Sequence, residues 1–194
     1  MTSRQGDLLE TALATTRHVA DGLGPDDLRR PTPCGEFDVR RLLEHVIGWQ
    51  LVTAACAVDE EPPLLDGSPT YRASSEPVRD LREASTTLVA NLRSRTEDTI
   101  TMPYRGVTPM SVMLAELIAE TVIHTWDLAT ARGRQVDFGA EVVAAAHDGL
   151  TLLLGESFAE VGFGVSAETP RAGDELGRLL VRSGRTPSEW PSVT

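Results

Sequence analysis

The stretch Glu120-Thr121-Val122-Ile123-His124 lies inside a long apolar segment and decides how the fold of this chain is interpreted. Its carboxylate and imidazole are four residues apart, so on a helix they share one face, one turn from each other. A third such residue, His45, lies in a second helical segment, Leu42-Leu43-Glu44-His45-Val46-Ile47-Gly48. Two imidazoles and one carboxylate suit zinc with three protein ligands and water, or a facial triad for iron or nickel.

Apolar residues at helical spacing predict the rest of the secondary structure. Five long helices are expected over about residues 7–23, 38–58, 76–95, 109–132 and 140–155, with a short one near 174–182. Asp38 suits the N-cap of the second helix, Thr108 with Pro109 suits the start of the fourth, and Gly133 suits its end. Residues 59–74 predict a loop, and residues 99–108 predict either a short strand pair or an irregular crossover.

Long amphipathic helices with almost no strand predict an all-α fold, an antiparallel up-down helical bundle with less than about a tenth of its residues in strands. The 194 residues are enough for a single domain, with the bundle over about 5–155 and a C-terminal extension over about 156–194.

Composition excludes several classes of protein. The net charge of -11 argues against binding to nucleic acid, whose phosphates need a basic face. No apolar run reaches the roughly 18 residues of a membrane span, and the N-terminus lacks a signal peptide, so we expect a cytoplasmic protein. All 18 basic residues are arginine, which indicates a GC-rich source such as an actinobacterium and excludes lysine Schiff-base chemistry.

Polar residues follow one line along the fourth predicted helix: Glu116, Glu120, His124 and Asp127. Such a stripe is commonly a solvated face. In a metal site, Glu116 could be an outer partner of Glu120, and Asp127 could orient the His124 imidazole as an outer carboxylate. Asp127 could equally pair with an arginine, and the candidates are Arg40, Arg41 and Arg132.

The remaining histidines and cysteines are weaker candidates. A lone histidine among apolar residues, as His45 is, more often belongs to the core than to a metal. Cys34 precedes the second helix, whose N-terminus can lower a thiol pKa, but a small buried residue is the commoner role. At 1.5 Å per residue it lies roughly 10 Å or more from His45, so we do not expect it to be a ligand. Cys56 fits the core, and His18 and His147 fit the surface.

Three stretches together resemble one family. Residues 32–48, which begin Thr32-Pro33-Cys34-Gly35, resemble the second-helix signature of the mycothiol-dependent maleylpyruvate isomerase N-terminal domain family. Residues 120–133 resemble its metal-binding helix, and residues 178–187 resemble the tail of its short actinobacterial members. The resemblance implies a DinB-like four-helix bundle with one divalent metal, usually zinc, held by His45, Glu120 and His124. It also implies that water or a low-molecular-weight thiol fills the open position.

The resemblance favours a zinc-dependent enzyme that uses mycothiol for transfer or isomerisation of a small electrophilic substrate. The isomerases of this family carry a further C-terminal domain that supplies an arginine, whereas only about 40 residues follow the fifth helix here. A metal-hydroxide hydrolase and a non-catalytic metal-binding accessory protein are therefore alternatives. An accessible fourth coordination position would favour the enzyme, and a fourth protein ligand would favour the accessory protein. A monomer and a homodimer both fit the sequence.

Overall fold

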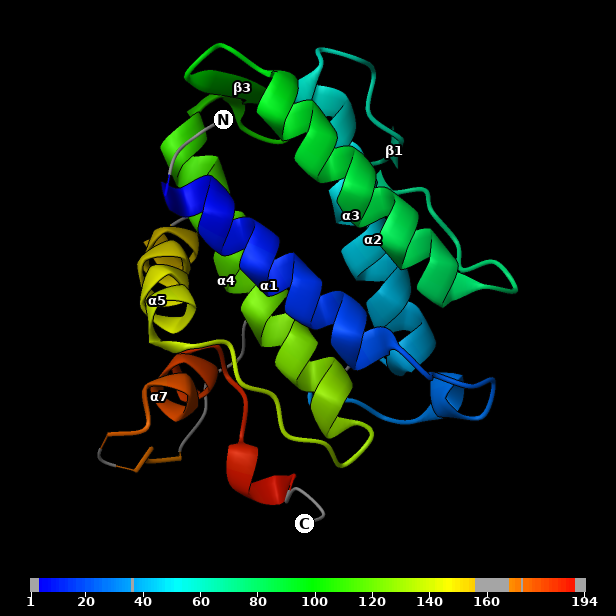
Figure 1. Ribbon diagram of the computed structural model, residues 1–194, viewed down its shortest axis with the longest axis vertical. Helices are drawn as coiled ribbons and strands as arrows, with labels where there is room; N and C mark the ends of the chain where they lie inside the picture. The colour runs from blue at the N-terminus through cyan, green and yellow to red at the C-terminus, as the bar shows by residue number, and fades with distance from the viewer. Residues whose placement is uncertain (1–3, 36, 156–167, 172, 191–194) are drawn as a thin grey trace.

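The helices of the computed structural model follow the apolar periodicity of the sequence (Figure 1). Residues 4–35, 37–155, 168–171 and 173–190 are described. The helices are α1 (Arg4–Ala20), η1 (Asp27–Arg29), α2 (Val39–Ala57), α3 (Pro77–Ser94), α4 (Met110–Thr130), α5 (Ala140–Gly155), α7 (Glu175–Arg182) and η2 (Pro187–Glu189). The predicted all-α class is confirmed.

Two short antiparallel hairpins interrupt the helices. The strands are β1 (Leu64–Leu65), β2 (Ser68–Pro69), β3 (Thr99–Met102) and β4 (Gly106–Pro109). The first hairpin lies in the segment predicted to be a loop. The second resolves the open alternative at residues 99–108 in favour of a strand pair, in which Ile100 is paired with Thr108.

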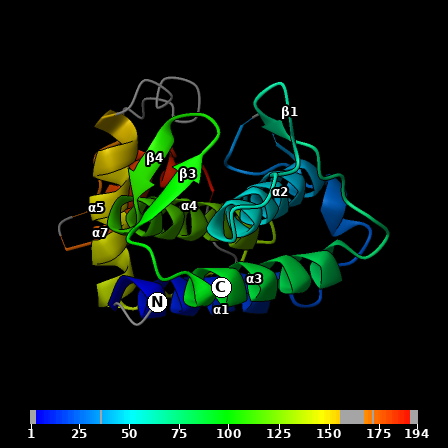
Figure 2. The same ribbon diagram turned by 90° about the horizontal axis from the view of Figure 1, so that it is seen from above.

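The long helices pack as pairs. α1 packs against α4, α2 against α3, and α5 against α4, while α7 packs on α5. Seen from above, α1 and α3 form one layer and α2 and α4 the other, with the β3–β4 hairpin over α4 (Figure 2). The two helices that carry the candidate metal ligands, α2 and α4, therefore share one layer.

Helix ends follow local chemistry, with one correction. The Asp38 side chain accepts a hydrogen bond from the Arg41 backbone N–H at 2.8 Å, which confirms it as the N-cap of α2. The expectation that Thr108 caps α4 is wrong. Thr108 is the strand partner of Ile100, its hydroxyl donates to the carbonyl of Gly106, and Pro109 occupies the cap position without a side-chain bond.

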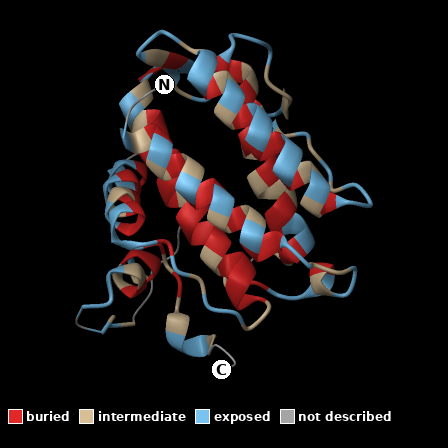
Figure 3. Ribbon diagram, in the orientation of Figure 1, coloured by how far each residue is buried: buried red, intermediate tan, exposed pale blue. Residues whose placement is uncertain are grey.

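α4 is the central helix of the bundle, since most of its residues are buried (Figure 3). Val122 and Ile123 have no exposed surface, although adjacent residues point in different directions around a helix. Most of the surface of this helix is covered, so the polar residues along it do not form the solvated face that such a stripe commonly is, although Glu120 stays partly exposed. Glu116, His124 and Asp127 are all buried and must find partners inside the protein.

The C-terminal segment is part of this packing. Leu179 of α7 is fully buried and belongs to the same apolar cluster as residues of α1, α4 and α5. Residues 156–167, where the extension was expected to begin, lie outside the described residues. Within the part of the chain that the structure describes, none of the helices has the length and hydropathy of a membrane span.

Close contact between α4 and α5 gives a test of the packing. A Cβ atom at Gly149 would lie 1.9 Å from the carbonyl oxygen of Ala115. We expect Gly149→Ala to lower the free energy of unfolding by about 1–3 kcal/mol, because the backbones would have to separate. Gly155→Ala on the same helix, with nothing within 4 Å of the new Cβ, should change it by less than about 0.5 kcal/mol. Urea denaturation measures both, and equal values would contradict this packing.

Candidate metal centre

Two helices bring the three expected ligand residues together. His45 comes from α2, and Glu120 and His124 lie one turn apart on α4. Glu120 Oε2 lies 3.1 Å from His124 Nε2 and 3.8 Å from His45 Nε2. The two imidazole rings meet edge to face with centroids 4.9 Å apart, and the three donor atoms all lie within 4.8 Å of one another. This donor set could hold one metal ion.

The triad has a buried end and an open end. The side chain of His124 is 7% exposed, whereas those of His45 and Glu120 are 28% and 33% exposed. His124 is therefore held by the core, and the other two donors border the solvent.

Without a metal, the carboxylate and the imidazoles satisfy one another. Burial opposes a charge on Glu120, but hydrogen bonds from His124 and His45 outweigh it and hold the pKa of Glu120 well below its usual range. Burial also opposes a charge on His124, yet hydrogen bonds to Asp127 and Glu120 raise its pKa to about 9. Burial lowers the pKa of His45. At neutral pH His124 carries the proton that a metal would displace.

Asp127 takes both of the roles that were left open for it. Its Oδ2 accepts a hydrogen bond from His124 Nδ1 at 3.0 Å and another from Arg185 Nη2 at 2.8 Å, while its Oδ1 faces Arg185 Nε at 3.3 Å. Burial opposes the charge of this fully enclosed carboxylate, but the Arg185 charge and the His124 hydrogen bond keep the pKa of Asp127 below normal. Asp127 therefore orients the His124 imidazole and forms an ion pair with Arg185 at the same time.

The arginine is not among the three candidates, which is a correction. Arg132 donates to backbone carbonyls of Val19, Asp21 and Gly22. Arg40 donates to the carbonyl of Ala73. Arg185 directly follows Gly184 at the end of α7, and no local sequence pattern indicates that its side chain reaches α4.

Glu116 forms an ion pair with the β3–β4 hairpin. It is 2% exposed and accepts two hydrogen bonds from Arg105, one of them at 2.8 Å and the other from Arg105 Nη2. Arg105 belongs to the turn of the β3–β4 hairpin, so this ion pair attaches the hairpin to α4. Of the two outer candidates, Asp127 contacts a predicted ligand, and Glu116 holds the hairpin.

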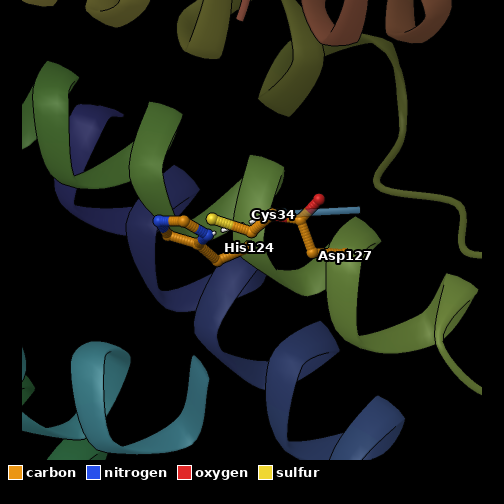
Figure 4. Close-up of side chains that lie close together, drawn as sticks. All are labelled: Cys34, His124 and Asp127. Carbon is orange, nitrogen blue, oxygen red and sulfur yellow. Dashed lines mark hydrogen bonds and ion pairs between the residues drawn. The ribbon is translucent and has the colours of Figure 1, made fainter. Parts of the chain in front are cut away.

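Cys34 lies nearer to the centre than its distance along the chain suggests. Its sulfur, a nitrogen of His124 and a carboxylate oxygen of Asp127 lie within 4.8 Å of one another, with the sulfur directed toward the imidazole (Figure 4). The segment before α2 folds back on itself, through a bridge between Pro31 and Asp38 and a 2.7 Å bond from the Thr32 hydroxyl to the Phe37 carbonyl. The rise of 1.5 Å per residue along α2 estimated only the distance from Cys34 to His45. It could not say how close Cys34 lies to His124, which belongs to α4.

Electrostatics separates the two groups that share His124. A cation near Cys34 and Asp127 would meet the Arg185 guanidinium, which already neutralises Asp127. The charge of Arg185 also acts on His45 and Glu120, but its guanidinium is hydrogen-bonded directly to the Asp127 carboxylate, whereas the Glu120 carboxylate faces the two imidazoles. The group of His45, Glu120 and His124 is therefore the better candidate for a metal.

The fold and the donor set together define a class: helical-bundle proteins with a candidate metal centre between two core helices. The chain belongs to the mycothiol maleylpyruvate isomerase N-terminal domain family, whose model matches residues 9–129. The crystal structure of a histidine-to-alanine mutant of the mycothiol-dependent maleylpyruvate isomerase has the same fold, with a TM-score of 0.60 at 14% identity over 84% of this chain and 72% of that one. The expected DinB-like four-helix bundle is thus confirmed.

Two curated relatives come from Mycobacterium tuberculosis, strains CDC 1551 / Oshkosh and ATCC 25618 / H37Rv, and both are described as uncharacterized proteins. Each is 28% identical over 166 residues, which cover 83% of this chain and 86% of the relative. The similarity therefore extends along most of both chains.

The raised pKa of His124 predicts how the metal-free protein responds to pH. The pKa is about 9 in the folded protein against 6.5 for the free side chain, so the stability it contributes is complete below pH 6.5 and is lost as the pH rises through 9. We expect the chelator-treated protein to lose at most on the order of 3 kcal/mol of unfolding free energy over that range.

Urea denaturation at pH 6.5 and pH 9 measures this loss. His124→Gln should remove most of the pH dependence, and His18→Gln, at an exposed position, should retain it. The same pH dependence in His124→Gln as in the wild type would show that another group is responsible.

Proposed function

We propose that this protein is a zinc-dependent enzyme that uses a low-molecular-weight thiol, mycothiol, for transfer or isomerisation of a small electrophilic substrate. His45, Glu120 and His124 would be the metal ligands, and nickel or iron are the other metals that suit this set. The family and the structural relative both carry mycothiol in their descriptions, which supports the thiol. A small-molecule substrate and a thiol would then be the partners of this protein.

One observation carries the proposal, namely the spacing of the donor atoms. Ligands placed about 2.1 Å from a tetrahedral metal lie about 3.4 Å from one another. The separations from Glu120 Oε2 to the two imidazole nitrogens, 3.1 and 3.8 Å, lie on either side of that value. Two nitrogens and one oxygen also match the donors that catalytic zinc sites use. The residues therefore fit the group that the family implies.

The count of protein ligands favours an enzyme over a non-catalytic accessory protein. Among the residues that the structure describes, no fourth histidine, cysteine, aspartate or glutamate joins this group. The donors His45 and Glu120 also border the solvent. Structural zinc sites are usually closed by four protein ligands, whereas catalytic sites keep one position for water or substrate.

When bound, a divalent cation would stabilise the thiolate form of a thiol at neutral pH and make it a nucleophile. The chain contributes the surroundings. His124 is fixed by the core and by Asp127, so its Nε2 faces the other donors. Glu120 supplies a single negative charge, which leaves the centre with a net positive charge that favours an anionic sulfur.

Aromatic side chains lie on the His45 side of the triad. The Phe37 ring lies 5.4 Å from the His45 ring, and Trp49, one turn along α2, meets Tyr104 of the hairpin at 5.6 Å. Burial and the negative charges of Glu116 and Glu120 outweigh Arg105 and raise the pKa of Tyr104 to about 12. Tyr104 therefore remains a neutral hydroxyl, which can donate a hydrogen bond to an oxygen of the substrate.

Metal content tests the ligand assignment. We expect the purified protein to hold about one divalent metal per chain and His45→Ala to hold far less, because two donors cannot replace three. His18→Ala, an exposed histidine on α1, is the matched control and should keep the metal. Elemental analysis of the folded proteins measures this, and an equal content in wild type and His45→Ala would remove His45 from the ligand set.

Thiol binding tests the chemistry. A thiol that binds the centre as thiolate must release its proton, so affinity should rise with pH until the free thiol is itself ionised. Calorimetry of the zinc-loaded protein with mycothiol, in buffers of different ionisation enthalpy, should show close to one proton released. His45→Ala is the control. Binding without proton release, or no binding at millimolar thiol, would oppose the thiol mechanism and favour a hydrolase or an accessory protein.

A further inference from the structure

The end of α7 directs one buried arginine into the bundle. Ser183 is fully buried, and its backbone N–H and hydroxyl both bond to the carbonyl of Leu180. Gly184 has a φ of +83°, a backbone conformation that residues other than glycine rarely adopt. The backbone N–H of Arg185 bonds to the Leu180 carbonyl at 2.9 Å. This turn ends α7 and points the next residue inward, so Arg185 is only 4% exposed.

The Arg185 guanidinium binds the Asp127 carboxylate through two nitrogens. Its Nη2 and Nε face the two carboxylate oxygens, and its Nη1 donates to the backbone carbonyl of Ser183 at 2.9 Å. A two-point contact fixes the plane of a carboxylate, whereas a single contact leaves it free to rotate. The carboxylate is therefore held with Oδ2 toward His124 Nδ1.

We propose that Arg185 is a positioning residue of the metal centre, which makes the C-terminal segment part of the site. By fixing Asp127, Arg185 keeps the proton of the metal-bound imidazole on His124 Nδ1 and leaves the lone pair on Nε2 facing His45 and Glu120. The inference rests on the proposed function, because it assigns a role toward the same metal. Its own basis is the geometry of the contacts between Arg185, Asp127 and His124.

The surface bonds that hold α7 on α5 involve other residues than the contacts of Arg185 with Asp127. Arg182, the last residue of α7, contacts His147 Nδ1 at 3.2 Å and the hydroxyl of Thr151 at 3.0 Å, both on α5. Arg182→Met thus weakens the docking of α7 without touching Asp127. It is the matched control for the loss of one arginine from the same segment.

The experiment measures zinc affinity by chelator competition and the His124 Nδ1–H signal by nuclear magnetic resonance in the zinc-loaded protein. Arg185→Met should weaken zinc binding roughly 10- to 100-fold and broaden or move that signal. Arg185→Lys keeps the positive charge but loses the two-point contact with Asp127. Its zinc affinity should therefore lie between those of the wild type and Arg185→Met. Arg182→Met should stay within about twofold of the wild type. In an Asp127→Asn protein, adding Arg185→Met should change affinity little, because the linking carboxylate is gone.

The outcomes separate the two claims. Zinc affinity within twofold of the wild type in Arg185→Met, with an unchanged His124 signal, overturns the role of Arg185 and leaves the proposed function intact. If circular dichroism shows that Arg185→Met does not fold, Arg185→Lys decides, and wild-type affinity in it overturns the inference. An equal loss in Arg182→Met would show that docking of α7 is what matters. Wild-type protein that binds no zinc overturns the proposed function itself.

Discussion

Asp127 is a carboxylate with no exposed surface, and the arrangement around the candidate centre depends on how its charge is balanced. Removing an ion from water costs several kcal/mol, which attraction returns only when partners occupy its oxygens in good geometry. Arg185 supplies the opposite charge and His124 supplies a second hydrogen bond. One interaction therefore joins the central helix, a candidate metal ligand and the C-terminal segment.

The same constraint acts along the whole of α4. Most of the surface of this helix is buried, so its enclosed charged residues require partners from other elements. Glu116 takes Arg105 from the β3–β4 hairpin, Glu120 faces His45 of α2, and Asp127 takes Arg185. These contacts attach the hairpin, α2 and the C-terminal segment to α4. α2 supplies His45, and the C-terminal segment binds Asp127 beside His124. The contacts that pack the core therefore also assemble the candidate site.

Much of the architecture could be predicted from the sequence because helix positions and helix ends depend on residues that are close together in the chain. The period of the apolar residues located every long helix within a few residues, and the Asp38 cap followed from a short side chain before an apolar run. The Glu120–His124 pair was readable because four residues make about one turn of a helix. His45 joined it through the expectation that bundles build sites from facing helices, and the structure places the donor atoms together.

What the sequence by itself determined is thus the all-α class, the helix positions and three residues suited to one metal. Only the tertiary structure decided their partners. Arg185 and Asp127 are 58 residues apart, and Cys34 reaches His124 because the segment before α2 folds back. Local periodicity says which face of a helix is buried and nothing about which distant side chain meets it. Choosing among eighteen arginines required the packing of α7 on α5 and the turn at Gly184, which together bring the Arg185 guanidinium to the fully buried carboxylate of Asp127.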